Sequence, residues 1–229
     1  MRPYERLATA RAPDGTALEL RRRAHEYLIL AGGHDLMSSE DEGSSRALGE
    51  LGCAHLARGA RARVLIGGLG MGYTLRAALD ATGPGAAIEV AELVPAVAAW
   101  NRDELAELAG RPLDDPRTEL LVEDVRDPIR RARGRYDAIL LDVDNGPDAL
   151  AHAQNDALYS RHGIAEAQRA LCAGGVLGVW SFSDDSRFTK RLKAQGLEVA
   201  VHRVDGSRKG RGRYHRVWIA RKPAKRCKI

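Results

Sequence analysis

Short apolar runs alternate with stretches of helical periodicity along most of this chain. The apolar runs predict strands over residues 63–67, 88–92, 118–122, 136–141, 176–180, 198–204 and 216–220. Apolar residues at helical spacing predict helices over residues 46–57, 73–79, 94–108, 128–133, 163–172 and 186–195. Strands that alternate with helices favour an α/β class, here a Rossmann-like, doubly wound and mainly parallel seven-stranded sheet.

Two shorter apolar runs precede this pattern, over residues 16–21 and 26–30, with a polar link between them. They predict a small N-terminal β-hairpin appendage. The polar stretch 33–45 that follows is expected to be a loop that ends in a helix cap. We therefore predict an N-terminal hairpin and loop over 1–42, a Rossmann-like domain over 43–220 and a basic tail over 221–229.

A glycine-rich turn lies between the strand that starts at Arg63 and the helix that starts at Tyr73. Side chains at Gly68, Gly70 and Gly72 would keep the backbone away from a ligand and would block a tight turn. Their G-x-G-x-G spacing brings backbone N–H groups and a helix N-terminus against a polar part of a ligand. A glycine motif alone is a weak signal, and here it gains from the strand and helix around it.

Glu92 ends the next predicted strand, 24 residues beyond Gly68. This spacing is near the roughly 20-residue offset of an acid that binds a ribose. A carboxylate there can accept hydrogen bonds from both ribose hydroxyls. The alternative is a solvated residue at the end of a strand.

Polar residues also follow the other predicted parallel strands, at Asp124, in 142–147 and in 181–185. Ligands of such sheets bind outside the carboxyl ends of the strands. Core packing alone does not explain acids at successive strand ends. Asp124 could instead cap a helix, and Asp142 could form an Asx-turn.

Charge is distributed unevenly over the 229 residues, whose net charge is +5. From Arg203 onward there are eleven Lys and Arg against one Asp, so this segment carries about +10. The segment 203–228 is thus a candidate for contact with nucleic acid. The alternative is a solvated loop and a frayed terminus.

The remaining composition excludes several classes of protein. No apolar run approaches the roughly 20 residues that cross a bilayer, and residues 1–6 lack the apolar core of a signal peptide. The three cysteines and seven histidines are dispersed, so we expect neither a disulfide framework nor a metal site. We expect a cytoplasmic protein with reduced thiols.

The glycine turn and strand ends together resemble the class I S-adenosylmethionine-dependent methyltransferases, and in particular their spermidine synthase-like branch. The residues that carry the resemblance are Leu65–Gly70, Val90–Glu92, Val122–Asp124, Leu140–Asp142, Leu158–Ser160 and Ala173–Val176. The resemblance covers about residues 16–220. It is specific for the fold and much less so for the reaction.

This resemblance implies S-adenosylmethionine as the cofactor. Gly68 and Gly70 would face its methionine part, Glu92 its ribose and Asp124 its adenine edge, while Asp142 would lie nearest the transferred group. The implied cofactor-binding set is Gly67, Gly68, Gly70, Gly72, Glu92, Leu93, Asp124, Val125 and Asp142. The implied catalytic set is Asp142, Asp144 and Tyr159, although Tyr159 could equally be a core or surface residue.

The chain departs from the motifs of true aminopropyltransferases at three places. Their aspartate in the glycine loop corresponds to Gly70, their Tyr-His pair to Ser45 and Arg46, and their Asp-Ser-Ser-Asp motif to 142–145. A doubly charged diamine needs carboxylates at set distances, so the missing acids favour a methyltransferase that acts on a small-molecule acceptor. The alternatives are a polyamine aminopropyltransferase and a non-catalytic nucleic-acid-binding module. The resemblance also implies a homodimer.

Overall fold

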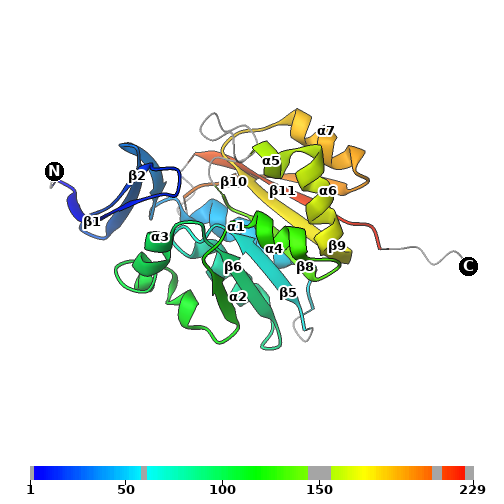
Figure 1. The fold of residues 1–229 in the computed structure, drawn as a ribbon, viewed down its shortest axis with the longest axis horizontal. Helices are drawn as coiled ribbons and strands as arrows, with labels where there is room; N and C mark the ends of the chain where they lie inside the picture. Colours follow the sequence, from blue (N-terminus) through cyan, green and yellow to red (C-terminus); the bar gives the residue numbers. More distant parts are fainter. Residues whose placement is uncertain (1–2, 58–60, 144–155, 208–212, 225–229) are drawn as a thin grey trace, which may run out of the picture.

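The computed structural model describes residues 3–57, 61–143, 156–207 and 213–224. The chain forms two sheets, and Figure 1 shows the smaller one, in blue, at one end of the larger. No helix within the described ranges is long and apolar enough to span a bilayer.

The larger sheet has seven strands in the order β10-β11-β9-β8-β5-β6-β7. Five neighbouring strands are parallel and β11 is antiparallel to both of its neighbours. The strands are β5 (Arg63–Gly67), β6 (Ala87–Ala91), β7 (Thr118–Leu121), β8 (Tyr136–Leu141), β9 (Leu171–Ser181), β10 (Glu198–Asp205) and β11 (Tyr214–Arg221). The prediction of a seven-stranded, mainly parallel sheet is confirmed, as is the antiparallel pair of its last two strands.

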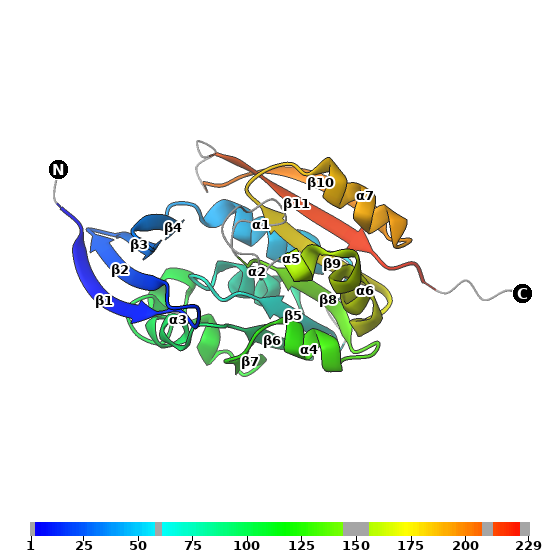
Figure 2. The same ribbon diagram turned by 45° about the horizontal axis from the view of Figure 1, so that its top comes forward.

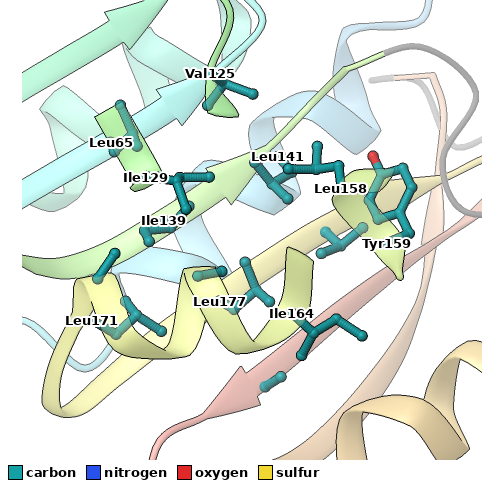
Figure 3. Close-up of a cluster of buried hydrophobic side chains, with 14 of the residues drawn as sticks. Leu65, Val125, Ile129, Ile139, Leu141, Leu158, Tyr159, Ile164, Leu171 and Leu177 are labelled. Atoms are coloured by element: carbon teal, nitrogen blue, oxygen red, sulfur yellow. The ribbon is translucent and has the colours of Figure 1, made fainter. Parts of the chain in front are cut away.

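Helices cover both faces of this sheet (Figure 2). The helices α1 (Glu42–Cys53) and α2 (Tyr73–Ala81) pack on one face. The other face carries α4 (Arg126–Arg131), α5 (Asp156–Tyr159), α6 (Arg161–Ala170) and α7 (Ser186–Ala194). Figure 3 shows this second core, in which Ile139 and Leu141 of β8, Leu177 of β9 and Ile164 of α6 belong to one cluster.

The smaller sheet has four antiparallel strands rather than the predicted two. They are β1 (Glu5–Arg11), β2 (Ala17–Arg23), β3 (Glu26–Ala31) and β4 (His34–Ser38). The prediction of a loop over 33–45 is therefore wrong at its start. Gly32 and Gly33 have φ values of +57° and +84°, which suits a two-residue hairpin turn between β3 and β4.

The smaller sheet packs against the region after β6, where α3 (Pro95–Trp100) is followed by the 3-10 turns η1 (Ala106–Ala109) and η2 (Pro112–Asp114). Leu20 and Ile29 of the sheet share a buried cluster with Trp100 and Met71. The sheet is thus packed onto the Rossmann-like body. The domain boundaries at 42/43 and 220/221 stay predictions.

The predicted helix over 94–108 ends early, at Trp100. The next residue, Asn101, donates from its side-chain amide to Val97 O at 2.9 Å and to Gly70 O at 2.8 Å. Asparagine competes in this way with the backbone hydrogen bonds of a helix. The contact also ties the end of α3 to the glycine turn.

The approach of α1 to α2 depends on Gly49. A Cβ atom at this position would lie 2.6 Å from Ala77 Cβ and 2.8 Å from Thr74 O. We expect Gly49→Ala to lower the free energy of unfolding by about 1–3 kcal/mol, the usual cost of overpacking, even though alanine favours helix.

Urea unfolding measures this change, and Glu50→Ala, at an exposed position of the same helix, is the control. The control should stay within about 0.5 kcal/mol of the wild type. Equal stability of the two variants would contradict the close approach of the helices.

Candidate functional site

The glycine turn after β5 has the backbone conformation that its sequence predicts. The φ values of Gly68, Gly70 and Gly72 are +86°, +53° and +82°, which side chains rarely permit. A Cβ atom at Gly68 would lie 2.4 Å from Asp142 O, so only glycine fits between β5 and the segment after β8.

A cavity of about 190 Å³ opens at this turn, and we call it the first cavity. Seven of the nine predicted cofactor-binding residues line it: Gly68, Gly70, Glu92, Leu93, Asp124, Val125 and Asp142. Gly67 and Gly72 are absent from the described lining, and both pack against neighbouring side chains, Gly67 against Val125 and Gly72 against Pro112.

Glu92 is buried, with 7% of its surface exposed. Its Oε2 accepts from Leu69 N–H at 2.9 Å and its Oε1 accepts from Val94 N–H at 2.8 Å. Each carboxylate oxygen has a further lone pair, so Glu92 can still accept from two hydroxyl groups. Its place in the lining fits the predicted ribose acid and not a solvated strand end.

Asp124 lies at the end of β7 and forms a local pair with Arg126. Its Oδ1 accepts from Arg126 N–H at 2.9 Å and its Oδ2 accepts from the Arg126 guanidinium at 2.9 and 2.5 Å. The pKa of Asp124 is lowered by these contacts against an opposing effect of burial. The N-cap of α4 is Val125, with no side-chain cap hydrogen bond, so Asp124 is not the helix cap of the alternative prediction. Both Asp124 and Arg126 line the first cavity.

Asp142 lies where the first cavity meets a second one. Thr74 Oγ1 lies 2.5 Å from Asp142 Oδ2 and 3.0 Å from Ser45 O. A threonine hydroxyl has one proton, so it cannot donate to both oxygens at once. If it donates to Ser45 O, the short contact requires a proton on Asp142. Burial raises the pKa of Asp142, against smaller lowering effects of hydrogen bonds from Thr74 and Ser45.

The other two predicted catalytic residues do not join Asp142 in the described site. Tyr159 is buried in the core, edge-on to Phe188 with ring centroids 5.7 Å apart. Its hydroxyl lies 3.4 Å from Val143 O, and it is not among the described residues that line the two cavities. Asp144 lies outside the described residues.

The second cavity, of about 620 Å³, shares Leu36, Met37, Gly70 and Asp142 with the first. Its lining includes the exposed carboxylates of Asp35 and Asp41. Its lining also includes residues from β9, β11 and their flanks, namely Trp180, Phe182, Arg213 and His215. The cavity is therefore acidic and aromatic.

His215 is a buried member of this lining. Its Nδ1 lies 2.8 Å from Ser44 Oγ, and its ring packs at 5.0 Å from Trp180 and 5.2 Å from Phe182, between centroids. Burial lowers the pKa of His215. The imidazole is therefore neutral at pH 7.

Sequence reasoning missed most of the walls of both cavities. The N-terminal sheet contributes Leu18, Ile29 and Ala31 to the first cavity, and β4 contributes to both. The Gly32-Gly33 pair between apolar runs was the signal for β4. No local signal marks His215, whose partner Ser44 is 171 residues away.

Several basic side chains in the described part of the segment 203–228 contact other residues of this chain. Arg203 stacks over the Tyr214 ring at 3.5 Å, Arg216 Nε lies 3.3 Å from Asp184 Oδ2, and Lys222 Nζ donates to Leu171 O at 2.6 Å. Contact with nucleic acid stays a prediction.

Comparison with solved structures identifies the fold. A spermidine synthase in complex with the transition-state analogue AdoDATO superposes with a TM-score of 0.73 over 95% of this chain and 72% of that one, at 16% identity. Spermidine synthase from Thermotoga maritima gives a TM-score of 0.72 with the same coverage, at 18% identity. The chain has a spermidine synthase-like fold.

Curated relatives agree with this identification, although no protein-family model matches. Polyamine aminopropyltransferase 2 of Pseudomonas aeruginosa is 37% identical over 126 residues, which are 53% of this chain and 35% of that protein. Polyamine aminopropyltransferase of Mycobacterium tuberculosis is 30% identical over 155 residues, 64% of this chain and 28% of the relative. The chain thus spans about a third of the length of the curated relatives it matches.

The prediction of a methyltransferase is wrong, because the homologues are polyamine aminopropyltransferases and the superposed structures are spermidine synthases. The prediction rested on missing acids at three motif positions. The structure shows that Asp35 and Asp41, outside those motifs, line the cavity beside Gly70. The site therefore contains acids even though the three motif positions lack them.

Asp142 generates a prediction about stability. Because its pKa is raised in the folded protein, the folded state binds its proton more tightly than the unfolded state. This contribution is fully present below the ordinary pKa of an aspartic acid and is lost as the pH rises through the raised pKa. Asp142→Asn removes the titration, so we expect the wild type to lose unfolding free energy relative to the variant as the pH rises.

Urea unfolding of both proteins between pH 4 and pH 8 measures the difference. Asp184→Asn, at an exposed carboxylate, is the control and should track the wild type. A difference between wild type and Asp142→Asn that stays constant with pH would contradict a raised pKa.

Proposed function

We propose that this protein transfers the aminopropyl group of decarboxylated S-adenosylmethionine to a nitrogen of an aliphatic polyamine-type acceptor. The observation that carries the proposal is the pair of cavities that meet at Gly70 and Asp142. One has the features of a nucleoside site, and the other is acidic and aromatic. The curated relatives are polyamine aminopropyltransferases.

The first cavity fits an adenosyl group. The turn at Gly68 and Gly70 leaves room that a Cβ atom would fill. Glu92 is held by backbone N–H groups and offers acceptors for ribose hydroxyls. Leu93 and Val125 supply apolar surface for a flat base.

The second cavity fits a cationic aliphatic amine. Asp35 and Asp41 attract ammonium groups, and the rings of Tyr73, Trp180 and Phe182 offer cation–π surfaces. Leu28, Leu36 and Met37 line the same cavity and can pack against methylene groups. We call this cavity the acceptor cavity from here on.

The reaction needs alignment and the removal of one proton. The lone pair of the acceptor nitrogen attacks the propyl carbon next to the sulfonium, so that a C–N bond forms and the C–S bond breaks. The bonding electrons go to sulfur, which leaves as neutral 5′-methylthioadenosine. Because the acceptor enters as an ammonium ion, this nitrogen must lose one proton before it attacks, and ionised Asp142 at the junction is the group we assign to accept it. A raised pKa makes the ionised carboxylate a stronger base.

Product formation tests the proposal. We expect the purified protein to release 5′-methylthioadenosine from decarboxylated S-adenosylmethionine only when an aliphatic amine such as 1,4-diaminobutane is present. Asp142→Asn should lower the rate by about 10²-fold or more, the usual share of a general base. Asp184→Asn, outside both cavities, is the matched control.

Chromatography of the nucleoside and mass spectrometry of the aminopropylated amine measure the two products. Release of 5′-methylthioadenosine without an amine product, or a full rate in Asp142→Asn, would contradict the assigned reaction.

Binding tests the nucleoside site independently. In Glu92 the two carboxylate oxygens accept from Leu69 N–H and from Val94 N–H. In Glu92→Gln one of these oxygens is replaced by an amide N–H₂, which cannot accept, so one of the two backbone donors loses its acceptor. We expect 5′-methylthioadenosine to bind about tenfold or more weakly, since a hydrogen bond to a charged group contributes about 1.5–3 kcal/mol.

Calorimetry measures the affinity, and Glu119→Gln on the exposed face of β7 is the control. Unchanged affinity in folded Glu92→Gln would remove Glu92 from the nucleoside site.

A further inference from the structure

The acceptor cavity contains a cation as well as its acids. Arg213 lines it, and its guanidinium carbon lies 5.8 Å from the centroid of Phe182, another lining residue. Arg213 forms no ion pair with an acid in the described part of the chain. Its charge is therefore available to a molecule bound in the cavity.

Arg213 and Asp41 lie near the same side chain. Both act on His215 through charge: Asp41 raises its pKa and Arg213 lowers it, and both effects are smaller than that of burial. The two groups are not paired with each other among the described contacts. One negative and one positive lining residue thus lie near His215.

An indole N–H lies in the same group of residues. Trp180 lines the cavity and packs against His215, and its Nε1 is buried without a hydrogen-bond partner among the described residues. A buried donor without an acceptor is unfavourable. This atom is closed to solvent, so it is a polar atom inside the cavity wall and not a contact for a bound molecule.

These residues lie in the part of the acceptor cavity that is not shared with the first cavity. The residues that the acceptor cavity shares with the first cavity are Leu36, Met37, Gly70 and Asp142. Trp180, Phe182, Arg213 and His215 belong to the acceptor cavity alone. A simple diamine that reacts at the junction and extends to these residues would bring its second ammonium near the Arg213 guanidinium, which is repulsive.

We propose that the acceptor is an aliphatic diamine that carries a carboxylate at the end remote from the reacting nitrogen. Arg213 pairs with this carboxylate, and Asp41 binds the neighbouring ammonium. The inference rests on the proposed function, and it names the acceptor class for the same site.

Two amines that differ by one carboxylate test the proposal: 2,5-diaminopentanoate and 1,4-diaminobutane. Calorimetry in the presence of saturating 5′-methylthioadenosine measures the affinity of each for the full-length protein. We expect the carboxylated amine to bind about tenfold or more tightly, which is typical of a charge-assisted hydrogen bond. Arg213→Gln should abolish the preference, whereas Arg203→Gln, which lines neither described cavity, should keep it.

Equal or tighter binding of 1,4-diaminobutane overturns the proposal, as does a preference that survives in Arg213→Gln. Absence of binding by both amines overturns it too. Transfer is assayed separately with decarboxylated S-adenosylmethionine. If the preference for the carboxylate depends on Arg213 but no aminopropylated product forms, the proposed reaction fails while the charge preference of the cavity stands.

Discussion

The hydrogen bonds between the Glu92 carboxylate and the backbone are the constraint on which the rest of the site depends. The carboxylate accepts from Leu69 N–H in the glycine turn and from Val94 N–H before α3. Backbone bonds from Gly68 N–H to Ala91 O and from Asp142 N–H to Gly67 O, both 2.9 Å, continue the sheet past its strand ends. Three chain segments are thereby fixed at one edge, and the first cavity forms where they meet.

The N-terminal sheet forms part of the wall of both cavities. Its buried cluster with Trp100 and Met71 holds β3 and β4 over the glycine turn. Met37 lies so close to Gly70 that a Cβ atom there would be 3.0 Å from its sulfur. An open α/β sheet offers a crevice at its carboxyl edge, and here a second sheet encloses that crevice.

Asp142 combines two requirements that oppose each other. Burial disfavours its charge, while hydrogen bonds from Thr74 and Ser45 favour the charge to a smaller extent. The pKa that results is raised, which makes the ionised carboxylate a stronger base. By contrast, the carboxylates of Asp35 and Asp41 in the acceptor cavity are exposed. Burial therefore separates one reactive acid from the acids that attract a cation.

The sequence by itself determined the parts of this protein that depend on neighbouring residues. Local periodicity and the glycine spacing were sufficient for the seven-stranded sheet, the turn at Gly68 and the acid at Glu92. The positions of Trp180, Arg213 and His215 beside the N-terminal segment follow only from the tertiary structure. They could not be predicted, because packing between elements far apart in the chain produces no periodic pattern of apolar residues. The same reason explains why the reaction class was misjudged. The three motif positions that lack acids report local chemistry, whereas Asp35 on β4 and Asp41 before α1 reach the acceptor cavity only through the fold.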